Sequence, residues 1–255
     1  MQPYPKNIVA VDDWDRHWND FAETPDYSPA VYYRRRVLVR MLGICAEEAG
    51  RRLVELGSGS GQFAREFCPR FPKVRFLGLD ISRAGVEQAR LHTPSAQFEM
   101  CDLLNPIENR SIRSFEATDA ICSEVLEHVD EPQRILTNTA AVMAPGCRLV
   151  VTVPGGPMNA FDRHIGHRRH YTPEELGGLL TSVGYQVERA LGIGFPFYNL
   201  YRLALFSAGS SVVKIASGPP SLGLRAAYHL FNALCHLNVD RWGWQTVGIA
   251  RWPGV

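Results

Sequence analysis

The chain has 255 residues, 45% of them hydrophobic, which is enough for one large α/β domain with a sizeable core or for a domain with a small cap. Basic and acidic residues number 27 and 26, so the net charge of +1 lacks the basic footprint of a nucleic-acid-binding protein, and we expect no nucleic-acid partner. The six cysteines are scattered without a C-x-x-C pair, which argues against a disulfide or zinc framework and predicts reduced thiols in a cytoplasmic protein.

The first fifty residues are predicted to form helices ahead of the main domain. Apolar residues at helical spacing indicate a helix over residues 29–49, and Gly50 is its expected stop. No apolar run of signal-peptide length comes before it. We therefore divide the chain into N-terminal cap helices (1–50) and one domain (51–255).

Strands and helices are predicted to alternate from residue 51 to residue 154. The expected strands cover residues 52–56, 74–80, 96–102, 115–124 and 147–154, and the expected helices cover 61–71, 82–92 and 131–143. This alternation is typical of a parallel sheet with helices on both faces. Ligands of such sheets bind beyond the carboxyl ends of the strands.

A glycine loop, "VELGSGSGQF" (54–63), follows the first expected strand. Its later part fits the relaxed dinucleotide pattern G-x-G-x-x-A, so the loop alone leaves a dinucleotide cofactor open. Asp80, 19 positions after Gly61, can accept two ribose hydroxyls. A buried anion at Glu55 is unfavourable beside a pyrophosphate and favourable beside a cationic ligand. Asp102 offers a carboxylate to an exocyclic amine.

Residues 54–153 resemble the core of class I S-adenosylmethionine-dependent methyltransferases. The resemblance is carried by "VELGSGSG", "FLGLDIS", "FEMCDLL", "ICSEVLEHV" and "PGCRLVVTVP", in the order and spacing of that family. It implies a Rossmann-like seven-strand sheet and S-adenosylmethionine as the cofactor. The cofactor residues that it implies are Glu55, Gly57, Gly59 and Gly61 for the methionine part, Asp80 for the ribose, Asp102 with Leu103 for the adenine, and Ser123 for the methionine amino group. Ile81, next to Asp80, is a further candidate for cofactor binding.

A loop rich in histidine and arginine, "DRHIGHRRHY" (162–171), follows the fifth expected strand. Thr172, Pro173 and Glu175 then form a capping box that starts a helix. "GHRRHYTPEEL" resembles a segment of methyltransferases that act on small molecules and on saccharide or lipid-linked intermediates. The catalytic candidates are His167, His170 and Tyr171, with a histidine as the base that removes a hydroxyl proton. Arg168 and Arg169 are candidates for binding an anionic group of the acceptor; the alternative is local packing and pairing with surface acids.

A metal site is not expected, although "EVLEHV" contains three candidate ligands. Helical spacing places Glu124, Glu127 and His128 on one face. The stretch resembles the ubiquinone-pathway O-methyltransferases, in which such acids and a histidine can hold a divalent cation. The alternative is a helix whose polar groups are bonded locally.

The C-terminal part contains an insertion at about 195–240, between a sixth strand (184–194) and a seventh (243–252). Two helices are predicted, near 197–216 and 222–237, separated by Gly218-Pro219-Pro220. We interpret the insertion as a lid that gives the acceptor an apolar wall, with Tyr198 and Tyr201 among its aromatic residues. The alternatives are a peripheral contact with a membrane surface and a homodimer interface. From the N-terminal side, Tyr32, Tyr33 and Arg36 are candidates to cover the cofactor.

Together these features predict a methyltransferase that uses S-adenosylmethionine on a small molecule. Oxygen is the favoured acceptor atom, with nitrogen or carbon as alternatives. The acceptor is expected to combine an anionic or polar head with an apolar body. The alternatives from other classes are an NAD(P)-dependent oxidoreductase and a non-catalytic nucleotide-binding protein.

Overall fold

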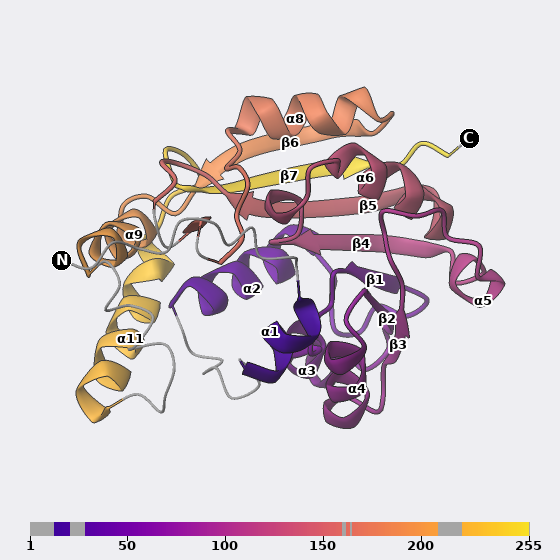
Figure 1. Ribbon diagram of the computed structural model, residues 1–255, viewed down its shortest axis with the longest axis horizontal. Helices are drawn as coiled ribbons and strands as arrows, with labels where there is room; N and C mark the ends of the chain where they lie inside the picture. The colour runs from indigo at the N-terminus through magenta and orange to yellow at the C-terminus, as the bar shows by residue number, and fades with distance from the viewer. Residues whose placement is uncertain (1–12, 21–28, 160–161, 164, 209–220, 255) are drawn as a thin grey trace.

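The computed structural model describes residues 13–20, 29–159, 162–163, 165–208 and 221–254. They contain a seven-stranded sheet in the order β3-β2-β1-β4-β5-β7-β6 (Figure 1). Strands β1 (Arg52–Leu56), β2 (Arg75–Asp80), β3 (Gln97–Met100), β4 (Ala117–Ser123) and β5 (Met143–Pro154) are parallel. Strand β7 (Gln245–Arg251) lies antiparallel between β5 and β6 (Gln186–Ile193). The prediction of a Rossmann-like fold with seven strands is confirmed.

Helices cover both faces of the sheet, because successive strand residues point to opposite sides. In β1, Leu53 packs into a core with helices α2 (Pro29–Leu42), α3 (Gln62–Arg70) and α4 (Arg83–His92). Its neighbour Val54 packs into a second core with α5 (Arg110–Arg113), α6 (Pro132–Thr139) and α8 (Pro173–Ser182). Glu55 follows the side of Leu53, and its side chain therefore lies on the α2 face of the sheet.

Local sequence signals set several helix boundaries. Ser82 caps α4 by accepting a hydrogen bond from Gly85 N at 3.0 Å, and Thr172 and Glu175 form the predicted capping box of α8. The expected end of the first long helix at residue 49 is wrong, because α2 ends at Leu42. Gly43 follows with a φ of +62°, a left-handed conformation that glycine adopts readily and that ends helices.

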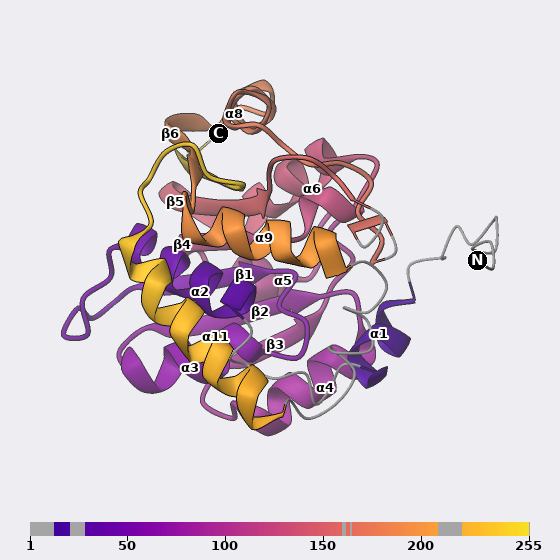
Figure 2. The ribbon, with the colours of Figure 1, turned by 90° about the vertical axis from the view of Figure 1, so that its left-hand side faces the viewer.

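The insertion lies beyond the carboxyl ends of the parallel strands, where α9 (Phe197–Ala208) and α11 (Leu222–Leu234) cross in front of the sheet (Figure 2). A 3-10 turn, η3 (Cys235–Leu237), follows α11. The part of the first predicted helix after residue 208 lies outside the described residues. Both insertion helices contact α2. Among the residues that the structure describes, no helix is long and apolar enough to cross a membrane.

A short helix that was not predicted, α1 (Trp14–Asp20), packs against α4 (Figures 1 and 2). Two 3-10 turns complete the described elements, η1 (Leu126–His128) after β4 and η2 (Ala140–Val142) before β5. The six cysteines, all within the described part of the chain, are free thiols. Helix α1, turn η1 and the insertion thus lie at the carboxyl edge of the sheet. The polar side chains considered below lie at the same edge.

Candidate active site

The glycine loop is fixed to the end of β2 by backbone and carboxylate hydrogen bonds. The amides of Gly57 and Ser58 donate to Leu79 O at 2.8 and 3.0 Å. The buried Asp80 carboxylate accepts from Gly59 N at 2.6 Å and from Ser82 N at 2.8 Å. Gly59 has a φ of +51°, which requires glycine. Burial raises the pKa of Asp80, whereas the two amide bonds lower it.

The Glu55 side chain is buried next to this loop, and one of its carboxylate oxygens lacks a hydrogen-bond partner among the described residues. Its Oε2 atom makes no hydrogen bond to any of the described residues. Burial raises the pKa of the carboxyl group well above 4.5, and the charge of Arg35 opposes this shift. An unsatisfied buried carboxylate is costly unless a ligand completes it. The position therefore fits a cationic ligand, such as the ammonium group of a methionine moiety.

Helix α1 covers the glycine loop. Asp15 accepts hydrogen bonds from Ser82 Oγ at 2.6 Å and from Ala84 N at 3.0 Å, at the start of α4. A Cβ atom on Gly59 would come within 2.1 Å of the Trp18 ring, so the indole lies directly against the loop. Sequence reasoning missed both side chains because a helix of seven residues carries little periodic signal.

The three residues proposed to cover the cofactor, Tyr32, Tyr33 and Arg36, make contacts within the protein. Tyr33 stacks on Tyr198 of the insertion, with ring centroids 5.1 Å apart. Arg36 lies over the Tyr32 ring at 5.7 Å, and its guanidinium is 2.9 Å from His236 Nδ1. These contacts attach α2 to the insertion.

The residues predicted for the adenine end follow β2 and β3. Asp102 accepts from Leu104 N at 2.9 Å and from Asn105 Nδ2 at 2.7 Å, which holds it in a tight turn. Leu103 is buried, whereas the side chain of Ile81, next to Asp80, is 50% exposed. An exposed apolar side chain of this kind, next to the acid predicted for the ribose, offers a surface for an aromatic ring.

A closed hydrogen-bond network surrounds the end of β4. Glu124 has a φ of +57°, and its carboxylate accepts from Gln245 Nε2 at 2.9 Å and pairs with Arg34 at 3.5 Å. Gln245 also donates to Val153 O at 2.9 Å and accepts from Tyr198 Oη at 2.8 Å. The amide nitrogen of Gln245 therefore donates two hydrogen bonds, and the amide oxygen accepts one. Sequence reasoning did not identify Gln245 or Arg34 as site residues.

Ser123 and the two tyrosines of the insertion lie near this network in the fold. Ser123 Oγ shares a hydrogen bond of 2.8 Å with Thr152 Oγ1. Tyr198 is buried, and Tyr201 lies at 6.3 Å from it and edge-on to Phe231 at 5.9 Å, measured between ring centroids. Tyr198 thus joins α9 to β7 through Gln245, while Tyr201 joins the two insertion helices.

The histidine loop forms a chain of imidazoles. His170 Nδ1 lies 3.1 Å from Gly156 O, and His167 Nδ1 lies 3.2 Å from His170 Nε2. His170 is also 3.6 Å from Asp162, which pairs with Arg202 at 3.0 Å. Burial, with the nearby cationic groups, lowers the pKa of His167 to about 2, and burial also lowers that of His170. Burial thus opposes the charged form of both rings.

The other three residues predicted in this loop have protein partners. The hydroxyl of buried Tyr171 donates to Leu126 O at 3.0 Å and so supports η1. Arg168 pairs with the Asp130 carboxylate at the surface, and Arg169 donates to Asp130 O at 3.3 Å. The alternative of pairing with a surface acid is thus observed for Arg168.

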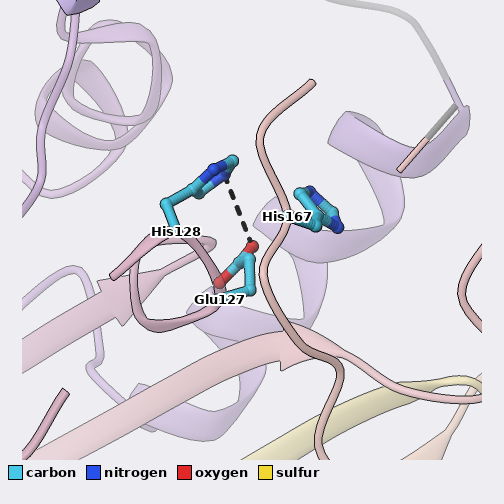
Figure 3. A group of neighbouring side chains, drawn as sticks. All are labelled: Glu127, His128 and His167. Atoms are coloured by element: carbon cyan, nitrogen blue, oxygen red, sulfur yellow. Dashed lines mark ion pairs between the residues drawn. The ribbon is translucent and has the colours of Figure 1, made fainter. Parts of the chain in front are cut away.

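The three metal-ligand candidates do not share a helical face, and that part of the sequence interpretation is wrong. Only residues 126–128 form a turn, of 3-10 type, and Glu124 precedes it in a left-handed conformation. Instead, ligand atoms of Glu127, His128 and His167 lie within 4.8 Å of one another (Figure 3). Asp162, His167 and His170 form a second such group.

A glycine loop after β1, an acid at the end of β2 and this strand order define the class of Rossmann-like enzymes that bind an adenosyl cofactor. A family model described as "Methyltransferase domain" matches residues 30–190. The chain belongs to this family, and it is a class I methyltransferase that depends on S-adenosylmethionine.

Relatives and solved structures agree with this assignment. The chain is 26% identical over 175 residues to a ubiquinone biosynthesis O-methyltransferase of Xanthomonas axonopodis pv. citri, covering 62% of this chain and 72% of the relative. It is 30% identical over 135 residues to a trans-aconitate 2-methyltransferase of Methylobacterium radiotolerans, about half of each chain. A phosphoethanolamine N-methyltransferase 2 of Haemonchus contortus, solved with phosphomonomethylethanolamine and S-adenosylhomocysteine, shares the fold with a TM-score of 0.62 at 16% identity, covering 99% of this chain and 62% of that one.

Proposed function

We propose that the chain transfers the methyl group of S-adenosylmethionine to an oxygen atom of a small molecule with an apolar body. The acceptor oxygen attacks the methyl carbon, the carbon–sulfur bond breaks, S-adenosylhomocysteine leaves, and the hydroxyl proton passes to a base. The cofactor supplies the activated carbon, so the protein has to bind both molecules in line and accept a proton. The name of the ubiquinone biosynthesis relatives supports oxygen as the acceptor atom.

We assign the cofactor to the residues around the glycine loop, and Glu55 carries this assignment. It is the buried carboxylate with an unsatisfied oxygen at the end of β1, where a cationic amino group would complete its hydrogen bonding. The amides that already hold Asp80 leave lone pairs of its two oxygens for the ribose hydroxyls. Asp102 and Leu103 would hold the adenine, and Ile81, next to Asp80, would pack on the cofactor. Trp18 of α1 would cover the bound cofactor.

We assign the acceptor to the region between the end of β4 and the insertion. Glu124, whose side chain is 19% exposed, and His128 supply polar groups there, while α9 and α11 supply apolar ones. We retain residues 195–240 as a lid over this region and residues 1–50 as the N-terminal cap. The base role of His167 or His170 and an anion-binding role of Arg168 or Arg169 stay predictions.

Methyl transfer to matched acceptors tests the proposal. The purified chain is incubated with radiolabelled S-adenosylmethionine and a phenol, the same phenol with a five-carbon alkyl tail, or the matching tailed aniline. Each buried methylene contributes about 0.8 kcal/mol, so the tail is expected to raise kcat/KM of the phenol by roughly tenfold or more. Faster transfer to the aniline would contradict oxygen as the acceptor atom, and no effect of the tail would contradict an apolar wall.

Two further measurements address the insertion. Flotation with liposomes tests the membrane-surface alternative, and the solution mass tests the homodimer alternative. For a lid we expect a monomer that does not float, because the apolar residues of the insertion then face the acceptor region.

A further inference from the structure

Glu127 is the starting point, because its carboxylate is buried without a donor. The side chain is fully buried, and neither oxygen makes a hydrogen bond to any of the described residues. An ion-pair contact joins its Oε1 to His128 Nε2 at 3.9 Å, which is too long for a hydrogen bond (Figure 3). A buried carboxylate in this state requires a proton or a cation close by.

A chain of imidazoles fixes which nitrogen of His167 carries the hydrogen. A carbonyl oxygen can only accept, so His170 donates from Nδ1 to Gly156 O, and the Nε2 atom of a neutral ring is then an acceptor. In that tautomer, His167 donates from Nδ1 to His170 Nε2 across the observed 3.2 Å. The Nε2 atom of His167 therefore carries a lone pair. Metal-bound histidines are oriented in this way, by a partner on the other ring nitrogen.

Glu124 does not belong to this group of side chains. Its carboxylate is used by Gln245 and Arg34, and its left-handed backbone separates it from the turn that carries Glu127. His167 takes the third place instead: its ring centroid is 4.8 Å from that of His128, and one ligand atom from each of Glu127, His128 and His167 lies within 4.8 Å of the others. The donor set is then two imidazoles and one carboxylate.

We propose that Glu127, His128 and His167 bind one divalent cation of the zinc class, with His170 as the residue that positions His167. Two nitrogen donors and one oxygen donor suit Zn²⁺ or Co²⁺, whereas Mg²⁺ prefers oxygen ligands and keeps several waters. The histidine-rich set distinguishes this site from one built on Glu124, Glu127 and His128, which would hold a harder ion. The inference concerns the acceptor side of the proposed active site, and its test does not depend on turnover.

Metal binding to the full chain tests the site directly. Metal-free protein is titrated with Co²⁺, and the visible absorption of the ion is followed. We expect one equivalent to bind with the intense bands of a four-coordinate site, Zn²⁺ to displace it, and excess Mg²⁺ to leave the bands unchanged. Octahedral, weakly absorbing Co²⁺ that Mg²⁺ displaces would overturn the proposal, as would the absence of bound Co²⁺.

Matched variants then identify the ligands, with thermal unfolding as the control for folding. Glu127→Gln and His167→Gln are expected to abolish the bands, and His170→Asn to weaken Co²⁺ binding by about 10- to 100-fold. Glu124→Gln is the control and should bind Co²⁺ as the parent chain does. Loss of binding in Glu124→Gln but not in His167→Gln would overturn the assignment. Calorimetry with S-adenosylmethionine separates the two proposals, because cofactor binding without metal binding rejects the metal site alone.

Discussion

Replacing Glu55 with glutamine is expected to change stability and cofactor affinity in opposite directions. The substitution keeps the shape of the side chain and removes its charge. In the cofactor-free protein the carboxylate is buried with one unsatisfied oxygen, so its removal relieves a desolvation cost. In the complex the same carboxylate would accept from the cationic amino group, so its removal costs affinity.

The magnitudes follow from the environment of the group. An unsatisfied buried polar group costs about 1 to 3 kcal/mol, and more when charged, so we expect Glu55→Gln to raise the free energy of unfolding without cofactor by about 1 to 2 kcal/mol at pH 7. A hydrogen bond to a charged partner contributes about 1.5 to 3 kcal/mol. The Kd for S-adenosylmethionine should therefore rise roughly tenfold to a hundredfold.

The dependence on pH supplies an independent check. Burial raises the folded pKa of Glu55 above its unfolded value of about 4.5, so the folded state binds the proton more tightly. The unfolded state then releases a proton that the folded state keeps, and the stability contributed by this group falls as pH rises above about 4.5. The slope should disappear in Glu55→Gln.

Urea unfolding of both proteins from pH 5 to pH 8 measures the stability, and titration calorimetry measures the cofactor affinity. Glu55→Asp serves as a control that keeps the charge. The reasoning would be refuted if Glu55→Gln were less stable than the parent chain without cofactor and bound S-adenosylmethionine equally well.

Three further predictions concern the loop and the network around β4. Gly59→Ala should raise the Kd for S-adenosylmethionine at least about tenfold in calorimetry, because the residue has a φ of +51° and its new methyl group would meet the Trp18 indole of α1. An unchanged Kd would show that α1 moves away freely. Asp80→Asn should lose charge-assisted bonds to two backbone amides and raise the same Kd by about tenfold or more, and unchanged binding would reject its ribose role. Gln245→Leu leaves buried partners unsatisfied and should lower the free energy of unfolding by about 2 to 4 kcal/mol. Tyr198→Phe removes the hydrogen bond to Gln245 and should lower it by about 1 kcal/mol. Equal losses in the two variants would contradict the central role of Gln245 in this hydrogen-bond network.

The positions of the strands and of the glycine loop could be predicted because their signals are local and repeated. Apolar runs bounded by turn residues identified the strands, and Ser82 and Thr172 identified two helix starts by their side-chain chemistry. The end of α2 was misplaced because Gly50 was read as the stop, whereas the helix ends before Gly43, which has the left-handed conformation.

The polar groups around β4 could not be predicted from spacing. Gln245 and Glu124 are 121 positions apart, and only the place of β7 in the sheet brings them together. The helical face expected for "EVLEHV" does not form, because Glu124 and Val125 have non-helical backbone angles and the turn begins at Leu126. His167 likewise reaches Glu127 through a loop whose path no periodic pattern encodes.

The position of β7 has a consequence for the order in which the protein can fold during synthesis. It is the last strand in chain order, yet it lies between β5 and β6, which pair with β7 and not with each other. In a ribosome-bound chain, β5 and β6 therefore lack this shared partner strand until residues 245–251 emerge. Until then β5 is an open edge that another nascent chain can join. Gln245 belongs to this late strand, so the hydrogen-bond network at the proposed acceptor site forms only after β7 has paired with β5 and β6.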